Sequence, residues 1–153
     1  MTAPAGVVDR RRSRWVGALI GIGLMAAVDE IVFHQMLAWH HFYDRGTPEI
    51  ALLSDGLLHA AELVVLVAGI FLVADLARHG ALSRVGLSSG TLLGAGAFQV
   101  FDGIVHHKVL RVHQVRYDVD LLPYDVAWIL AGVLLMAAGV LVGRRGRRDA
   151  RIS

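Results

Sequence analysis

Residues 94–113 read GAGAFQVFDGIVHHKVLRVH, and residues 21–40, GIGLMAAVDEIVFHQMLAWH, follow the same pattern without a gap. Both stretches contain G-x-G-x5-D-x-I-V-x-H-x2-L-x2-H, which is identity at eight of twenty positions. Each stretch begins as an apolar segment and ends among ionisable residues. The repeat predicts that the chain holds two copies of one structural unit.

The composition is that of a membrane protein. Hydrophobic residues make up 56% of the 153 residues and aromatic residues 7%, which is too apolar for an ordinary soluble domain of this size. The chain has no cysteine, so disulfides, thiolate metal sites and cysteine nucleophiles are excluded. Any metal ion would therefore be bound by nitrogen and oxygen ligands.

Four segments are predicted to cross the bilayer as helices. Residues 126–143 are uncharged, and residues 85–101 are uncharged and rich in Gly and Ser, which let membrane helices approach closely. The other two spans begin at Trp15 and near Ile50, and each carries ionisable residues with it. The GIG and GAG runs lie inside spans, where they are expected to serve helix packing.

The predicted fold is an all-α integral membrane four-helix bundle built from two tandem helical hairpins. The two hairpins face the same way, so a pseudo-twofold axis along the membrane normal is expected. The membrane domain covers residues 15–143, with repeat one at residues 15–78 and repeat two at residues 82–143. Basic tails flank it at residues 1–14 and 144–153.

The distribution of arginine predicts that both termini are cytoplasmic. Arginines precede the first span, lie between the second and third spans, and follow the fourth, whereas few cationic residues lie on the other side. The basic tails are expected to contact anionic lipids and not nucleic acid. The amino terminus resembles a signal peptide, but it lacks a small-x-small cleavage site and is expected to be retained.

Ionisable residues gather in one layer in the outer half of the predicted bundle. At about 1.5 Å per residue, five of them lie roughly 22 to 29 Å from the nearest cytoplasmic arginine. Such residues are costly in a membrane, about 3 kcal/mol each, and usually pair in the bundle interior. These five residues are Asp29, His59, Glu62, Asp102 and Asp125, with His34 and His107 slightly higher and His40, His41 and His113 at the interface.

A transition metal ion would give the ionisable side chains of this layer a common partner, because imidazole and carboxylate are suitable ligands for copper, iron and zinc. The candidate ligands are Asp29, His34, His40, His59, Glu62, Asp102, His106, His107 and His113, with Glu30, His41, Asp55 and Asp125 as outer partners that orient them. Glu62 is also the candidate proton carrier if the site is catalytic. Redox chemistry in the membrane and metal handling, for example of copper, are the functions that this site suggests.

Helical spacing supports some of these ligand pairs. His59 and Glu62 are three residues apart and Asp102 and His106 four, so each pair shares a helix face. His34, however, lies about 140° from Asp29 around an ideal α-helix, and no complete E-x-x-H set recurs. A two-metal carboxylate site is therefore not specifically indicated.

Two other classes of function remain open at this stage. The first is a haem-binding electron carrier, with His34 and His107 as axial ligands. The second is a proton or ion pathway, or a structural subunit, in which a polar network holds the hairpins together without a metal. Whether the protein is an enzyme is not indicated, since no G-x-S-x-G, phosphate-loop or H-E-x-x-H motif occurs.

At the stretches DEIVFHQMLAWHH, SDGLLHA and DGIVHHKVLRVHQVR the chain resembles the bacterial four-span membrane proteins of domain-of-unknown-function family 2243. The resemblance covers nearly the whole chain outside the tails. It implies a multi-pass protein of the bacterial cytoplasmic (inner) membrane, in contact with the lipid bilayer. Small residues on the last two predicted spans permit self-association without requiring it, so a membrane-protein partner or a second copy stays open as a further contact. Members of the family tend to have two adjacent histidines where this chain has His113 and Gln114. An association of the relatives with copper-oxidase assembly would favour copper as the metal.

Overall fold

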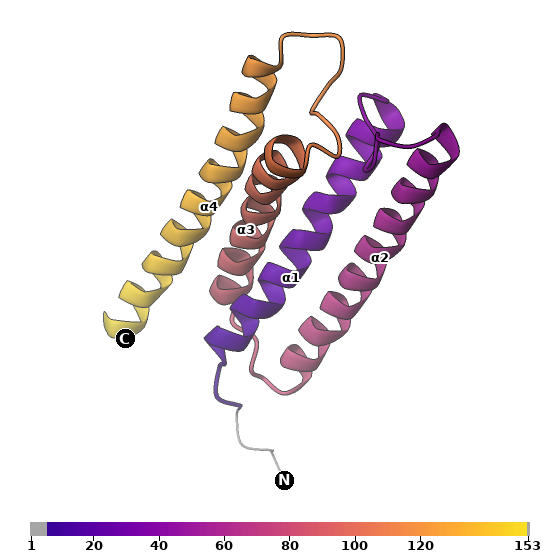
Figure 1. The fold of residues 1–153 in the computed structure, drawn as a ribbon. Helices are drawn as coiled ribbons and strands as arrows, with labels where there is room; N and C mark the ends of the chain where they lie inside the picture. Colours follow the sequence, from indigo (N-terminus) through magenta and orange to yellow (C-terminus); the bar gives the residue numbers. More distant parts are fainter. Residues whose placement is uncertain (1–5, 153) are drawn as a thin grey trace.

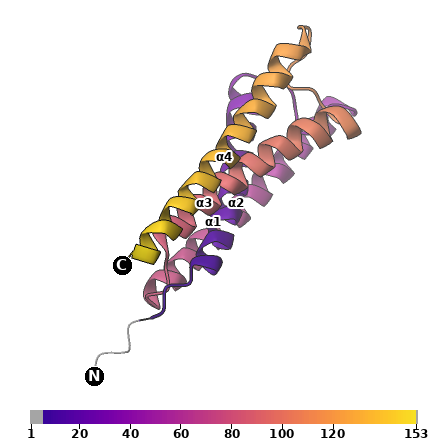
Figure 2. The same cartoon turned by 90° about the vertical axis from the view of Figure 1, so that its left-hand side faces the viewer.

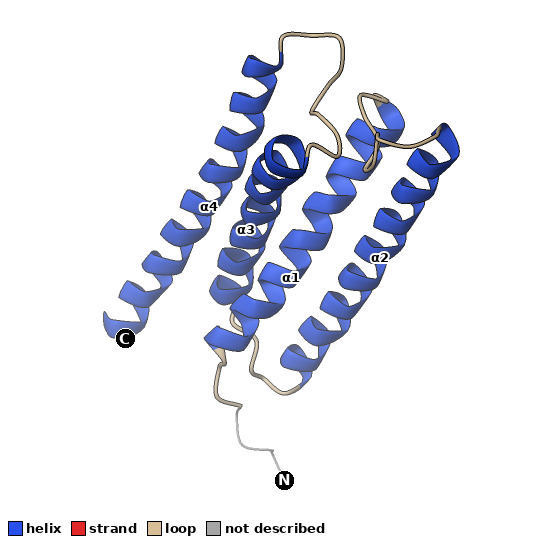
Figure 3. Cartoon of the chain, in the orientation of Figure 1, coloured by secondary structure: helices blue, strands red, loops and turns tan. Residues whose placement is uncertain are grey.

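A computed structural model describes residues 6–152, with side chains described as far as Arg145. Residues 1–5 and Ser153, which belong to the predicted basic tails, lie outside this range. The described chain is helical, as Figure 3 shows, and the prediction of an all-α fold is confirmed. The helices are α1 (Arg10–Val28), η1 (Asp29–Met36), α2 (Pro48–Arg78), α3 (Arg84–Phe101), η2 (Asp102–Leu110) and α4 (Leu121–Ile152).

Local sequence signals fix where the helices begin. The Asp9 carboxylate accepts a hydrogen bond from the Arg12 backbone N–H at 2.8 Å, so α1 begins at Arg10, five residues before the predicted span. Ser83 caps α3 in the same way through the Gly86 N–H at 3.0 Å. Pro48 stands at the first position of α2, where its missing N–H is harmless.

Three helical segments are long and apolar enough to cross a membrane: Arg10–Met36, Pro48–Arg78 and Leu121–Arg145. The segment α3 runs alongside them but contains many Gly and Ser residues. It lies in the interior of the molecule, where helix packing replaces the lipid contacts that demand large apolar side chains. That the chain crosses the membrane four times therefore stays a prediction.

The helices stand in a row, in the order α2, α1, α3, α4 (Figure 1). Among the described residues, α2 packs against α1 and α4 packs against α3, so the outer helices leave one side free. On α2 this free side carries large apolar residues such as Leu57, Val64 and Phe71, which suit contact with lipid. Figure 2 shows the row from the side, with the upper parts of α3 and α4 diverging.

The central pair, α1 and α3, is held together by glycines on both helices. A Cβ atom at Gly17 or Gly21 would lie 2.2 or 2.1 Å from the carbonyl oxygens of Leu87 and Thr91. In return, a Cβ atom at Gly90 or Gly94 would lie 2.0 or 2.1 Å from the carbonyl oxygens of Arg14 and Ala18. The two backbones are therefore in direct contact, as small residues spaced by four permit in membrane helices.

Both ends of the described chain lie at the same end of the row, and the loops at residues 37–47 and 111–120 lie at the other (Figure 1). The row therefore has one end with the arginine-rich segments and one end with the histidine-bearing loops. Which end faces the cytoplasm stays a prediction from the arginine distribution.

Candidate metal centre

Two π-helices place aspartate and histidine side by side. α1 becomes the π-helix η1 at Asp29, and α3 becomes the π-helix η2 at Asp102. A π-helix joins residue i to residue i+5, so side chains five apart share a face. His34 Nε2 lies 3.6 Å from Asp29 Oδ2, and His107 Nε2 lies 3.0 Å from Asp102 Oδ2. The expected separation of 140° between Asp29 and His34 was wrong because it assumed an α-helix.

The loops that follow the π-helices return a second histidine to each aspartate. His40 Nε2 lies 3.8 Å from Asp29 Oδ1, and His113 Nε2 lies 3.4 Å from Asp102 Oδ1. The left-handed backbone conformation of Ala38 and of Arg111 lets each loop fold back toward its aspartate. We call Asp29, His34 and His40 the first triad and Asp102, His107 and His113 the second triad.

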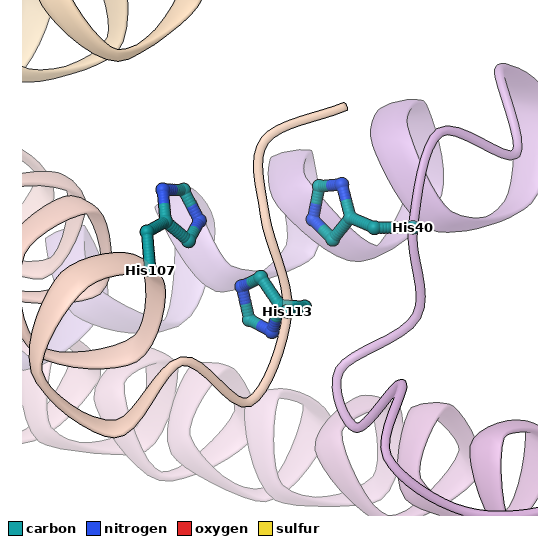
Figure 4. A group of neighbouring side chains, drawn as sticks. All are labelled: His40, His107 and His113. Carbon is teal, nitrogen blue, oxygen red and sulfur yellow. The ribbon is translucent and has the colours of Figure 1, made fainter. Parts of the chain in front are cut away.

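The two triads meet through their imidazoles. The rings of His40 and His113 stack with centroids 4.7 Å apart and planes inclined by 17°. His34 lies 4.5 Å from His40 and His107 lies 4.8 Å from His113, so the four rings form a continuous array. Figure 4 shows three of these rings converging from η2 and the two loops. One nitrogen each from His40, His107 and His113 lies within 4.8 Å of the others.

The six side chains of the triads are buried, with at most 3% of each exposed. Within the described chain, no hydrogen-bond partner reaches Asp29 Oδ1, Asp102 Oδ2, either nitrogen of His107, or the Nε2 atoms of His34, His40 and His113. Even the 3.0 Å contact between His107 and Asp102 lacks hydrogen-bond geometry. Unpaired buried donors and acceptors are rare, and this many at one point require an explanation.

The other ring nitrogens explain how the imidazoles are oriented. His40 Nδ1 donates to the Val115 carbonyl and His113 Nδ1 to the Phe42 carbonyl, both at 2.8 Å. Because a carbonyl oxygen only accepts, both Nδ1 atoms carry the proton, and in the neutral ring Nε2 has a free lone pair. This arrangement, with one nitrogen held by an oxygen and the other free, is typical of metal-binding histidines.

Burial favours the neutral form of the loop histidine. The pKa of His40 is lowered to about 2, first because burial penalises the charged ring and then because His113 and His34 lie close to it. At neutral pH the His40 ring is therefore uncharged and its Nε2 lone pair is available as a ligand.

Around the first triad lies a shell of hydrogen-bonded acids. Glu30 Oε2 lies 2.7 Å from His34 Nδ1, and Asp55 Oδ1 lies 3.1 Å from the same nitrogen. Asp55 also accepts from the Phe42 N–H at 2.7 Å and contacts His41 Nδ1 at 2.6 Å. Glu30 and Asp55, which were predicted as outer partners, thus contact His34 of the first triad, and His41 contacts Asp55.

The remaining predicted residues lie outside the triads. His106 contacts Asp102 Oδ1 at 2.8 Å from the edge of the second triad. His59 pairs with Glu62 at 2.6 Å on α2, and 48% of the His59 side chain is exposed. Asp125 forms an ion pair with Lys108. The structure therefore brings together six of the nine predicted ligands and places His106 beside them.

One contribution to the centre was not foreseen from the sequence. The carbonyl groups of Phe42 and Val115, which orient His113 and His40, come from the loops, and their residue types carry no signal for this role. The π-helices, by contrast, had a signal, since the spacing D-x4-H recurs at Asp29 and Asp102 and matches the i to i+5 geometry.

These features define an all-helical membrane protein with a buried cluster of histidines and carboxylates. The chain belongs to the family described as predicted membrane protein (DUF2243), whose model matches residues 16–146. No curated protein and no solved structure matches the chain.

Proposed function

We propose that the protein is a membrane metalloprotein in which each triad binds one first-row transition ion, giving a two-metal centre for redox chemistry. The observation that carries the proposal is the convergence of buried, unpartnered donor atoms on both triads. One cation in each triad would provide a partner for the unpaired Nε2 atoms and carboxylate oxygens, whereas hydrogen bonds within the cluster do not.

The types of ligand favour a site that binds iron over a site that handles copper. Each triad offers two histidines and one carboxylate, the ligand set of non-haem iron sites that keep open positions. Thiolate ligands, which select Cu(I), are excluded because the chain has no cysteine, and neither triad contains a methionine thioether. Burial of the six side chains also favours a resident ion over one that is passed on.

The array of imidazole rings favours a metal ion over haem as the bound cofactor. A porphyrin held between His34 and His107 would have to occupy the space of His40 and His113, whose rings continue the array at 4.5 to 4.8 Å. A Soret band in the purified protein would contradict the two-metal proposal and favour haem.

Elemental analysis of untagged protein, purified without chelator, tests the proposal. We expect about two equivalents of metal per chain, mainly iron, in the wild type and at most half of that in His107→Ala. The matched control is His79→Ala, because His79 is 70% exposed and lies at the other end of the molecule. Folded wild-type protein without metal that also takes up no added iron, copper, zinc or manganese would refute the proposal.

A further inference from the structure

The helices α1 and α4 do not pack against each other, because α3 lies between them (Figure 1). Two hollows each have residues of α1, α3 and α4 in their walls, and we call the two hollows together the groove. A hollow of about 260 Å³ lies at the end where α1 begins, with Ser89 of α3 and Gly143 of α4 in its lining. The other, of about 370 Å³, lies nearer the loops and includes Gln99 of α3 and Trp128 of α4.

The first hollow is strongly cationic. It is lined by Arg10, Arg11 and Arg14, and no carboxylate of the described side chains forms an ion pair with any of the three. Arg12, on the same helix turn, differs because it pairs with Asp75 at 3.0 Å. The Arg10 guanidinium also donates to the Gly143 carbonyl in the lining of the hollow. Three arginines that line one hollow match the negative charge of a phosphate.

The second hollow is apolar. Met25, Val28, Ala127 and Ala131 line it, and Trp128 contributes an aromatic wall. Met25 lies eleven positions after Arg14 on α1, which corresponds to about 16 Å along the helix and is within the reach of an acyl chain. The groove thus has a cationic end and an apolar end in the arrangement of a phospholipid.

We propose that one anionic phospholipid occupies the groove between α1 and α4. Its phosphate lies among Arg10, Arg11 and Arg14, and one acyl chain extends toward Met25 and Trp128. Trp128 packs against the metal-ligand candidate His107, with ring centroids 6.0 Å apart, so the lipid covers one wall of the centre. The lipid site rests on the arginines and the groove and does not depend on metal binding.

Native mass spectrometry with added phosphatidylglycerol tests the site. We expect one lipid per wild-type chain and about 30-fold weaker binding in the double variant Arg10→Gln/Arg14→Gln, which corresponds to about 1 kcal/mol for each arginine. The matched control is Arg12→Gln, expected to bind within about twofold of the wild type because Arg12 already has a carboxylate partner.

A second variant tests the apolar end without changing charge. Ala131→Phe fills part of the second hollow and is expected to weaken lipid binding while leaving the arginines intact. Inorganic phosphate, added in place of the lipid, is the remaining ligand in the binding test. Binding of phosphate to the arginines without retention of phosphatidylglycerol would assign the hollow to a free anion and overturn the proposal, as would equal lipid binding by wild type and the double variant.

Discussion

Asp102→Asn is expected to release the ion of the second triad, lowering its affinity by more than about 100-fold and the metal content from about two equivalents to one. Asp102 faces three histidines, since its oxygens lie 2.8 Å from His106, 3.0 Å from His107 and 3.4 Å from His113. Loss of an outer partner alone costs 10- to 100-fold in affinity, so loss of an anionic ligand costs more. Metal content of purified protein and competition with a chromophoric chelator give the measurement.

Asp125→Asn is the matched control, because Asp125 lies near the same end of the molecule but pairs with Lys108 and not with either triad. It is expected to keep the full metal content. Both variants should unfold at the wild-type concentration of SDS when prepared without metal, which separates ligation from folding. Equal metal content in Asp102→Asn and Asp125→Asn would exclude Asp102 as a ligand.

Gly90→Ala is expected to destabilise the contact between α1 and α3 by about 3 kcal/mol, the upper part of the range for overpacking. The added Cβ would lie 2.0 Å from the Arg14 carbonyl oxygen, which is backbone and cannot rotate away. The helices must move apart, and this displaces η1 relative to η2. Unfolding by SDS in mixed micelles measures the loss of stability, and reduced metal content should accompany it.

Gly56→Ala controls for the substitution itself. A Cβ atom at Gly56 has no neighbour within 4 Å, and Ala favours a helix over Gly by up to about 1 kcal/mol. This variant should therefore be as stable as the wild type or slightly more stable. If Gly90→Ala unfolded at the same SDS concentration as Gly56→Ala, the close approach of α1 and α3 would be refuted.

The helices and their packing residues could be predicted because each depends on local sequence. Apolar length indicates the spans at α1, α2 and α4, and the small residues on α1 and α3 indicate close helix contact. The spatial order of the helices could not be predicted, since any apolar face can pack against lipid or protein. Why α3 is less apolar than its neighbours becomes clear only from its central position.

The candidate centre was predicted as a pool of residues and not as an arrangement. The recurring D-x4-H-x5-H pattern selects both triads, but angles counted on an ideal α-helix separate Asp29 from His34. The residue His59 entered the pool through its spacing to Glu62, and that pairing exists, yet its exposed position separates it from the triads. Ligation by any of these residues stays a prediction until metal is measured.

The loops that carry His40 and His113 are bonded to each other reciprocally. His40 is held by the Val115 carbonyl, His113 by the Phe42 carbonyl, and the Asp44 N–H donates to the Val112 carbonyl at 3.0 Å. Val115 lies 75 residues after His40 in the sequence, so during synthesis the segment with His40 is made well before the carbonyl that orients its ring. All three residues of the first triad lie in the first half of the chain, whereas the carbonyl that orients His40 and the ring that stacks on it lie in the second half. The array of imidazoles is therefore complete only when both halves of the chain are present.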